Sequence, residues 1–133
     1  LTAQLLAGLA QLKSVRVWGI TDPAKFSERL PTVSITHAKL APQQLAEHLA
    51  EEGIFVWSGN YYALPLTQAL GREPEGMVRI GLLHYNTAEE IERLLEVLGR
   101  GLTVAAARAE FTLDDALAQR QQEASTSAAQ DLL

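Results

Sequence analysis

One arginine stands inside an apolar stretch that otherwise has the composition of a β-strand. Residues 76–83 read GMVRIGLL, and Arg79 is the single charge among them. A guanidinium in an apolar setting needs an anionic partner, and its planar fork of donors matches a carboxylate. Arg79 is therefore the first candidate for ligand binding. Two simpler interpretations stay open, namely a solvated edge position or an ion pair within the protein, with Glu73, Glu75 or Asp22.

The second candidate is an aromatic segment at residues 57–62, which reads WSGNYY. Ser58, Gly59 and Asn60 are typical turn residues, so we expect a turn with aromatic side chains on both flanks. Such side chains have a large apolar body and, in tyrosine and tryptophan, a polar tip. They suit the wall of a pocket and also a hydrophobic lid over a small core, and the residues alone leave both interpretations open.

Composition excludes several other kinds of chemistry. The chain has no cysteine, which rules out disulfides, thiolate metal sites and a cysteine nucleophile. His37, His48 and His84 lack metal-ligand spacing, and no phosphate-binding or GxSxG motif occurs, so we predict no metal site. The net charge of −5 does not favour nucleic acid or an anionic membrane surface. No apolar run is long enough to span a bilayer.

The elements that must position Arg79 are a strand and the helix after it. Strand alternation over residues 77–85 places Val78, Ile80 and Leu82 on one face and Arg79 on the other, with Met77, Gly81 and Leu83. Thr87 and Glu90 have the spacing of a capping box. The helix that follows has an apolar face, and we expect it to end near Gly99 or Gly101.

The rest of the chain predicts a small sheet covered by helices. We expect helices at residues 2–12, capped by Thr2, and at 42–52 and 65–70, with helical turns after Asp22. Strands are expected at 15–20, 32–36 and 54–57, followed by a turn at 58–60. No long crossover helix separates the first two strands, which favours a mainly antiparallel sheet and an α+β fold. We predict one domain over residues 1–101 and a helical or disordered tail over 102–133.

Residues 78–95, VRIGLLHYNTAEEIERLL, resemble the end of the class-V aminotransferase family, which includes the cysteine desulfurases. These enzymes are fold-type I and depend on pyridoxal phosphate (PLP). Their sequences end with an arginine-bearing strand, a Tyr-Asn-Thr turn and a helix that starts with acidic residues. Residues 29–36 and 41–66 resemble the preceding pieces of the same C-terminal small domain. The resemblance extends over about residues 15–98 and implies a small antiparallel sheet with helices.

The resemblance implies that Arg79 binds the α-carboxylate of an amino-acid substrate. It implies further substrate-binding residues, Asn60, Tyr61 and Tyr62, and further pocket-lining residues, Trp57, Ser58 and Gly59. In one branch of true desulfurases this loop reads Arg-Thr-Gly-His-His-Cys-Ala. Here Tyr62 stands at the cysteine position and Trp57 at the arginine position, so a protein persulfide cannot form at that position.

The family's cofactor lysine lies in a large domain, which would precede Leu1. Lys13, Lys25 and Lys39 stand in no comparable context. We therefore expect no catalytic and no cofactor-binding residue in this chain, which would not be competent alone. Its expected partners are a large PLP-binding domain, an amino-acid substrate and a second copy in a homodimer. Its expected location is the cytoplasm. An apolar surface that contacts the large domain is expected from the stripe of the N-terminal helix together with two aromatic residues: Leu5, Leu6, Leu9, Trp57 and Tyr61.

Two functional hypotheses follow. The first is the small domain of a class-V PLP enzyme. The residues of this domain do not determine which reaction the enzyme catalyses. The second is a standalone α+β module that binds a ligand or a protein, in which Arg79 makes a structural ion pair. The sequence upstream of Leu1 in the gene distinguishes them, because a lysine-bearing large domain there favours the first.

Overall fold

The computed structural model describes the backbone of residues 1–109 and the side chains of residues 1–100. Its centre is a four-stranded antiparallel sheet in the order β1-β2-β4-β3. The strands are β1 (Val15–Trp18), β2 (Thr32–His37), β3 (Trp57–Gly59) and β4 (Met77–Gly81). This arrangement confirms the predicted α+β class with a small antiparallel sheet.

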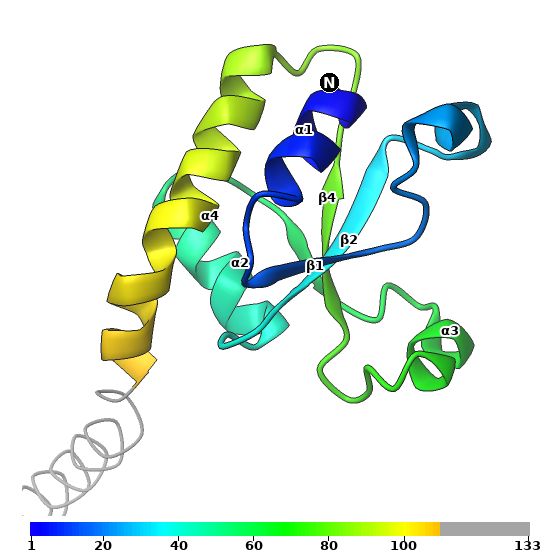
Figure 1. Cartoon of the computed structure of the whole chain (residues 1–133). Coiled ribbons are helices and arrows are strands. Elements are labelled where there is room, and N and C mark those ends of the chain that lie inside the picture. Colours follow the sequence, from blue (N-terminus) through cyan, green and yellow to red (C-terminus); the bar gives the residue numbers. More distant parts are fainter. Residues whose placement is uncertain (110–133) are drawn as a thin grey trace, which may run out of the picture.

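Three helices cover one face of the sheet. They are α1 (Thr2–Leu9), α2 (Pro42–Glu51) and α4 (Ala88–Ala109), and Figure 1 shows them gathered on one side. The 3-10 helix η1 (Pro23–Glu28) and the short α3 (Leu64–Ala69) lie apart from them. The inward residues of β2 and β4 meet the helices in the core, which includes Val33, Ile35, Val78, Ile80, Leu45, Leu49, Ile91 and Leu94.

The N-terminal helix is part of this core, so the expected contact of its stripe with another domain is wrong. Leu5 and Leu9 are fully buried, because α1 packs against α4 and β1. The packing is close: a Cβ added to Gly8 would lie 2.2 Å from Leu95 Cδ1. The helix ends at Leu9, before the predicted end, and the predicted Thr2 cap is also wrong, since Leu1 occupies the cap position without a side-chain hydrogen bond.

Strand β3 begins later than predicted. Gly53 ends α2 in a left-handed conformation with φ of 76°, and the Ile54 N–H donates to the Leu49 carbonyl at 2.9 Å. Because the Ile54 N–H is used in this hydrogen bond at the end of α2, the chain does not pair with β4 there. Pairing starts only at Trp57, which lies opposite Arg79. The predicted turn at 58–60 is therefore wrong in part, because residues 58 and 59 belong to the strand.

The start of α4 confirms the predicted capping box. The Thr87 N–H donates to Glu90 Oε2 at 2.9 Å, and the Glu90 N–H donates to Thr87 Oγ1 at 3.3 Å. The predicted end is wrong, since the helix continues through Gly99 to Ala109. A helix tolerates an interior glycine at a cost of about 1 kcal/mol. The predicted domain boundary after residue 101 thus falls inside a continuous helix, and the tail beyond residue 109 lies outside the described residues. None of the described helices has the length and apolar character to cross a membrane.

Candidate functional site

Arg79 lies on the side of the sheet that the helices leave uncovered. Val78 and Ile80, its neighbours in β4, are 0% and 4% exposed in the core, whereas Arg79 is exposed. The strand registers pair Arg79 with Ser34 and with Trp57, and pair Ser34 with Trp18. Paired residues of a sheet point to the same face. One row, Trp18-Ser34-Arg79-Trp57, therefore crosses all four strands, and we call the surface that carries it the open face.

Two aromatic rings flank the Arg79 side chain. Its Cζ lies 4.9 Å from the centre of the Tyr61 ring and 5.9 Å from that of Trp57. A guanidinium over a ring is attracted to the negative ring face while its in-plane N–H donors stay available. The aromatic segment thus lies beside the arginine, as expected.

The Tyr61 ring is fixed by an unusual turn. Tyr61 and Tyr62 have φ of 56° and 60°, a left-handed conformation that costs non-glycine residues energy. The Asn60 side-chain oxygen accepts from the Tyr62 N–H at 3.2 Å, which stabilises the turn. The Tyr61 hydroxyl donates to the Met77 carbonyl of β4. Burial raises the pKa of Tyr61, so the hydroxyl stays protonated in this hydrogen bond.

The guanidinium of Arg79 has no carboxylate within 4.0 Å among the described residues. The three partners considered from the sequence are otherwise placed: Asp22 accepts from the Ala24 N–H at 3.0 Å, and Glu73 accepts from the Thr67 hydroxyl. Glu75 forms no ion pair with it either. Gly81 leaves space on the same face, since an added Cβ there would meet no atom within 4 Å.

A second arginine cluster on the open face escaped the sequence interpretation. The Cζ atoms of Arg16 and Arg72 lie 4.0 Å and 5.3 Å from the centre of the Trp18 ring. Trp18 Nε1 donates to Thr36 Oγ1 at 3.0 Å, which holds the indole in place. The alternation of Arg16 and Trp18 in β1 is a local signal, but Arg72 comes from the loop between α3 and β4.

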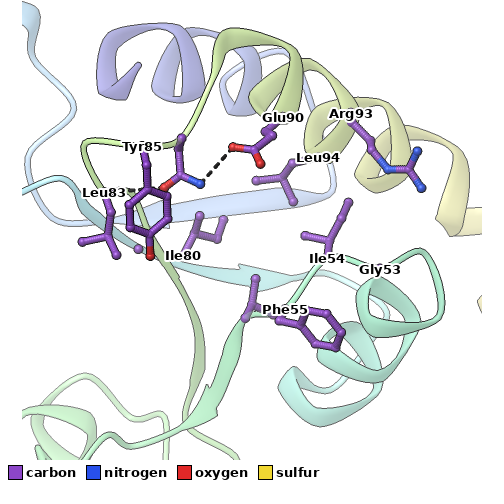
Figure 2. A pocket seen from close by; sticks show the side chains of 12 residues that line it. Gly53, Ile54, Phe55, Ile80, Leu83, Tyr85, Glu90, Arg93 and Leu94 are labelled. Atoms are coloured by element: carbon purple, nitrogen blue, oxygen red, sulfur yellow. Dashed lines mark hydrogen bonds between the residues drawn. The ribbon is translucent and has the colours of Figure 1, made fainter.

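The cavity near the helices is a separate feature. It has a volume of about 490 Å³ and lies between the 53–56 segment, the end of β4 and the start of α4. Figure 2 shows Leu83 and Tyr85 on one side of it and Phe55 on the other, with Glu90 and Arg93 along α4. None of the site residues expected from the sequence lines this cavity. No cluster of potential metal ligands occurs within the described part of the chain.

Comparisons with known proteins show the family of the chain. The model of the family "Aminotransferase class-V" matches residues 1–94. The chain belongs to the class-V aminotransferase family. Members of this family depend on PLP in general.

Its similarity to individual members covers one segment of each. A probable cysteine desulfurase of Pseudomonas putida is 34% identical over 101 residues, which cover 74% of this chain and 22% of the relative. An aminotransferase-like protein of Gibberella zeae is 31% identical over 100 residues, 74% of this chain and 25% of the relative. The solved apo structure of a cysteine desulfurase from Thermococcus onnurineus superposes with a TM-score of 0.64 at 31% identity, covering 74% of this chain and 24% of that chain. The chain therefore spans about a quarter of the length of the class-V relatives it matches.

The residues of this chain do not fit PLP itself. Lys13, Lys25 and Lys39 are all exposed, and none belongs to the clusters around Arg79 or Trp18. The open face instead carries arginines and aromatic rings, a combination that suits a planar anion.

The structure brings only some of the predicted site residues together. Arg79, Trp57 and Tyr61 form one contact group. Asn60 supports the turn through its side chain, and Tyr62 is 96% exposed. Ser58 and Gly59 pair with the first residues of β4.

Proposed function

We propose that this chain is the C-terminal small domain of a PLP-dependent class-V enzyme and that Arg79 binds the α-carboxylate of its amino-acid substrate. One observation carries the proposal: Arg79 projects from a central strand between two aromatic rings, with no carboxylate within 4.0 Å among the described residues. A substrate-binding arginine must keep its fork of donors available, whereas a structural one is closed by a carboxylate of the protein.

The neighbouring residues have supporting roles in this proposal. Trp57 and Tyr61 hold the guanidinium from its flanks. The backbone of Ser58 and Gly59 would form the edge of the proposed pocket, because Ser58 pairs with the buried Val78 and its side chain points to the opposite face. Asn60 maintains the turn, which leaves the exposed Tyr62 available to contact the substrate. Sulfur transfer through a persulfide of this chain is not part of the proposal, since the chain has no cysteine.

The remainder of the enzyme would supply the cofactor chemistry. We propose a large PLP-binding domain as the partner of residues 1–101, with residues 102–133 as an appended tail and a homodimer as the assembly. The chain alone would not be catalytically competent, because its lysines are exposed and belong to neither arginine cluster. We also propose a cytoplasmic location, which fractionation of cells that produce the tagged gene product would test.

The decisive experiment compares Arg79→Lys and Arg79→Gln in the complete gene product. Loss of hydrogen bonds to a charged group costs about 1.5–3 kcal/mol, so we expect the KM for the amino acid to rise roughly 10- to 100-fold in R79Q. R79K keeps the charge but loses the fork, and an intermediate KM is expected. The PLP absorption band should be unchanged in both variants. Arg93→Gln, which removes the same charge on α4, is the matched control. An unchanged KM in R79Q, with the melting temperature preserved, would refute the role.

A standalone binding module is the second candidate. Phe55 is 85% exposed, and Leu83 and Tyr85 are also exposed around the cavity, an apolar surface of the kind found at protein contacts. The gene decides between the candidates: a lysine-bearing domain encoded upstream of Leu1 supports the enzyme, and a start codon directly before Leu1 supports the module.

A further inference from the structure

The arginines of the open face lack the counter-ions that a chain of this composition could supply. The net charge of the chain is −5, yet no carboxylate lies within 4.0 Å of Arg16, Arg72 or Arg79 among the described residues. By contrast, Arg93 lies 4.0 Å from a carboxylate oxygen of Glu52, on the helix-covered side. Arg16, Arg72 and Arg79 thus share the lack of a protein counter-ion within the part of the chain that the structure describes.

Two of these arginines converge on a single indole. Arg16 from β1 and Arg72 from the α3–β4 loop both place their Cζ within 5.3 Å of the Trp18 ring centre. Since both lie so near one ring centre, the two Cζ atoms are at most about 9 Å apart. Two positive charges within that range repel each other, and an anion bound beside them would offset the repulsion. Arg72 uses its Nε to bond the Leu70 carbonyl at 3.3 Å, which orients its terminal nitrogens. Trp18 is itself held through its bond to Thr36.

This cluster lies in the same row as Arg79. Trp18 and Arg79 are separated by one strand, β2, through the pairs Trp18–Ser34 and Ser34–Arg79. Neighbouring strands are about 4.8 Å apart, so the two backbone positions are about 10 Å apart. Ser34, between them, is partly buried and has a small side chain. A ligand held at Arg79 by one acidic group can therefore extend along the row to the second cluster.

We propose that Arg16 and Arg72, around Trp18, form a second anion-binding subsite, so that the amino acid bound at Arg79 carries a second acidic group at the far end of its side chain. The inference rests on the proposed function of Arg79 and specifies its substrate class: an acidic amino acid with the carboxylate spacing of glutamate or longer. The distal group is recognised by two guanidinium forks, and the α-carboxylate by one.

The two tryptophans of the chain provide separate reporters for the two subsites. Trp57 adjoins Arg79 and Trp18 adjoins the second cluster, so their two indole N–H signals in an NMR spectrum are assigned with W57F and W18F. We would titrate the 133-residue chain with glutamate and 2-aminoadipate, and in parallel with norvaline and norleucine, which have apolar side chains. The neutral-side-chain ligands should shift the Trp57 signal alone. The acidic ligands should shift both signals and bind about tenfold more tightly.

The double variant R16Q/R72Q tests the assignment. It should abolish the Trp18 shift and the tenfold preference for acidic ligands while the Trp57 response to norleucine persists, which also shows that the variant is folded. Arg93→Gln removes one positive charge from the helix-covered side and should change neither response. If Trp57 responds to every ligand but Trp18 to none, the second subsite is refuted and the role of Arg79 stands. If Trp57 itself does not respond, the proposed function fails, and this inference fails with it.

Discussion

The backbone of Gly59 occupies the space in which a side chain of Gly76 would lie. A Cβ added to Gly76 would be 2.1 Å from the Gly59 carbonyl carbon and 2.2 Å from its oxygen. Gly76 also has φ of 72°, in the left-handed region. This close approach joins the end of β3 to the start of β4, and so it sets the positions of Trp57 and Arg79 relative to each other.

Gly76→Ala should therefore destabilise the fold by more than about 2 kcal/mol, through the left-handed backbone and the backbone clash together. Gly81→Ala, at the other end of β4, is the matched control, because an added Cβ there meets no atom within 4 Å. Alanine is preferred over glycine within a strand, so G81A should be more stable by roughly 0.5–1 kcal/mol. Urea unfolding measures both. Equal effects of the two substitutions would contradict the packing at Gly76.

Thr87→Ala should lower the free energy of unfolding by roughly 0.5–2 kcal/mol, because the hydroxyl that accepts from the Glu90 N–H is lost. Thr87→Ser keeps that acceptor and should stay close to wild type. Thermal unfolding of the three proteins is the measurement. Identical curves for T87A and wild type would show that Thr87 does not cap α4 in solution.

His37 should make the fold less stable in mild acid. Its Nδ1 accepts from the backbone N–H groups of Lys39 and Leu40, at 3.2 Å and 3.0 Å. Burial, with a smaller contribution from the charge of Lys39, lowers the pKa of His37 below 6.5. Below pH 6.5 the unfolded chain binds the proton before the folded one does, so stability falls as the pH decreases from that value.

The substitution His37→Asn tests this pH dependence, since asparagine keeps a side-chain acceptor for the turn but does not titrate. Denaturant midpoints measured between pH 7.5 and pH 5 should fall less steeply in H37N than in wild type. His84→Asn, at an exposed position after β4, is the matched control for the substitution itself. Parallel profiles for H37N and wild type would exclude His37 as the titrating group.

The chain by itself should form no stoichiometric covalent adduct with PLP. Its lysines are exposed and belong to no common site, so any reaction should be slow and spread over several of them. Incubation with PLP, reduction with borohydride and mass analysis of peptides measure this. Full modification of one lysine would mean that this chain holds a cofactor site of its own.

Local patterns predicted the elements that place Arg79. Alternation identified the buried face of β4, and the spacing of Thr87 and Glu90 identified the start of α4. Both are determined by residues close together in the sequence. The end of α4 was not predictable in this way, because glycine at position 99 is compatible with either a helix end or a helix interior.

The second arginine cluster was missed for a different reason. It forms only when the loop that carries Arg72 folds over β1, next to Arg16 and Trp18. Such a contact depends on the order of the strands in the sheet, which alternation does not specify. The stacking of Tyr61 on Arg79 likewise requires two tyrosines with positive φ, a conformation that residue preferences do not favour.

Because Arg79 is exposed on a central strand, selection for ligand binding and selection for folding stability act on it separately. Its backbone is paired on both sides, by β2 and β3, while its guanidinium contributes no ion pair among the described residues. In a scan of every substitution at this position, cellular abundance should therefore vary little among non-proline residues. Growth that depends on the proposed activity should decline for every substitution, and least for lysine. At the buried positions Val78 and Ile80, by contrast, each polar substitution should lower cellular abundance. Substitutions at position 79 can therefore change ligand binding without changing the stability of the fold.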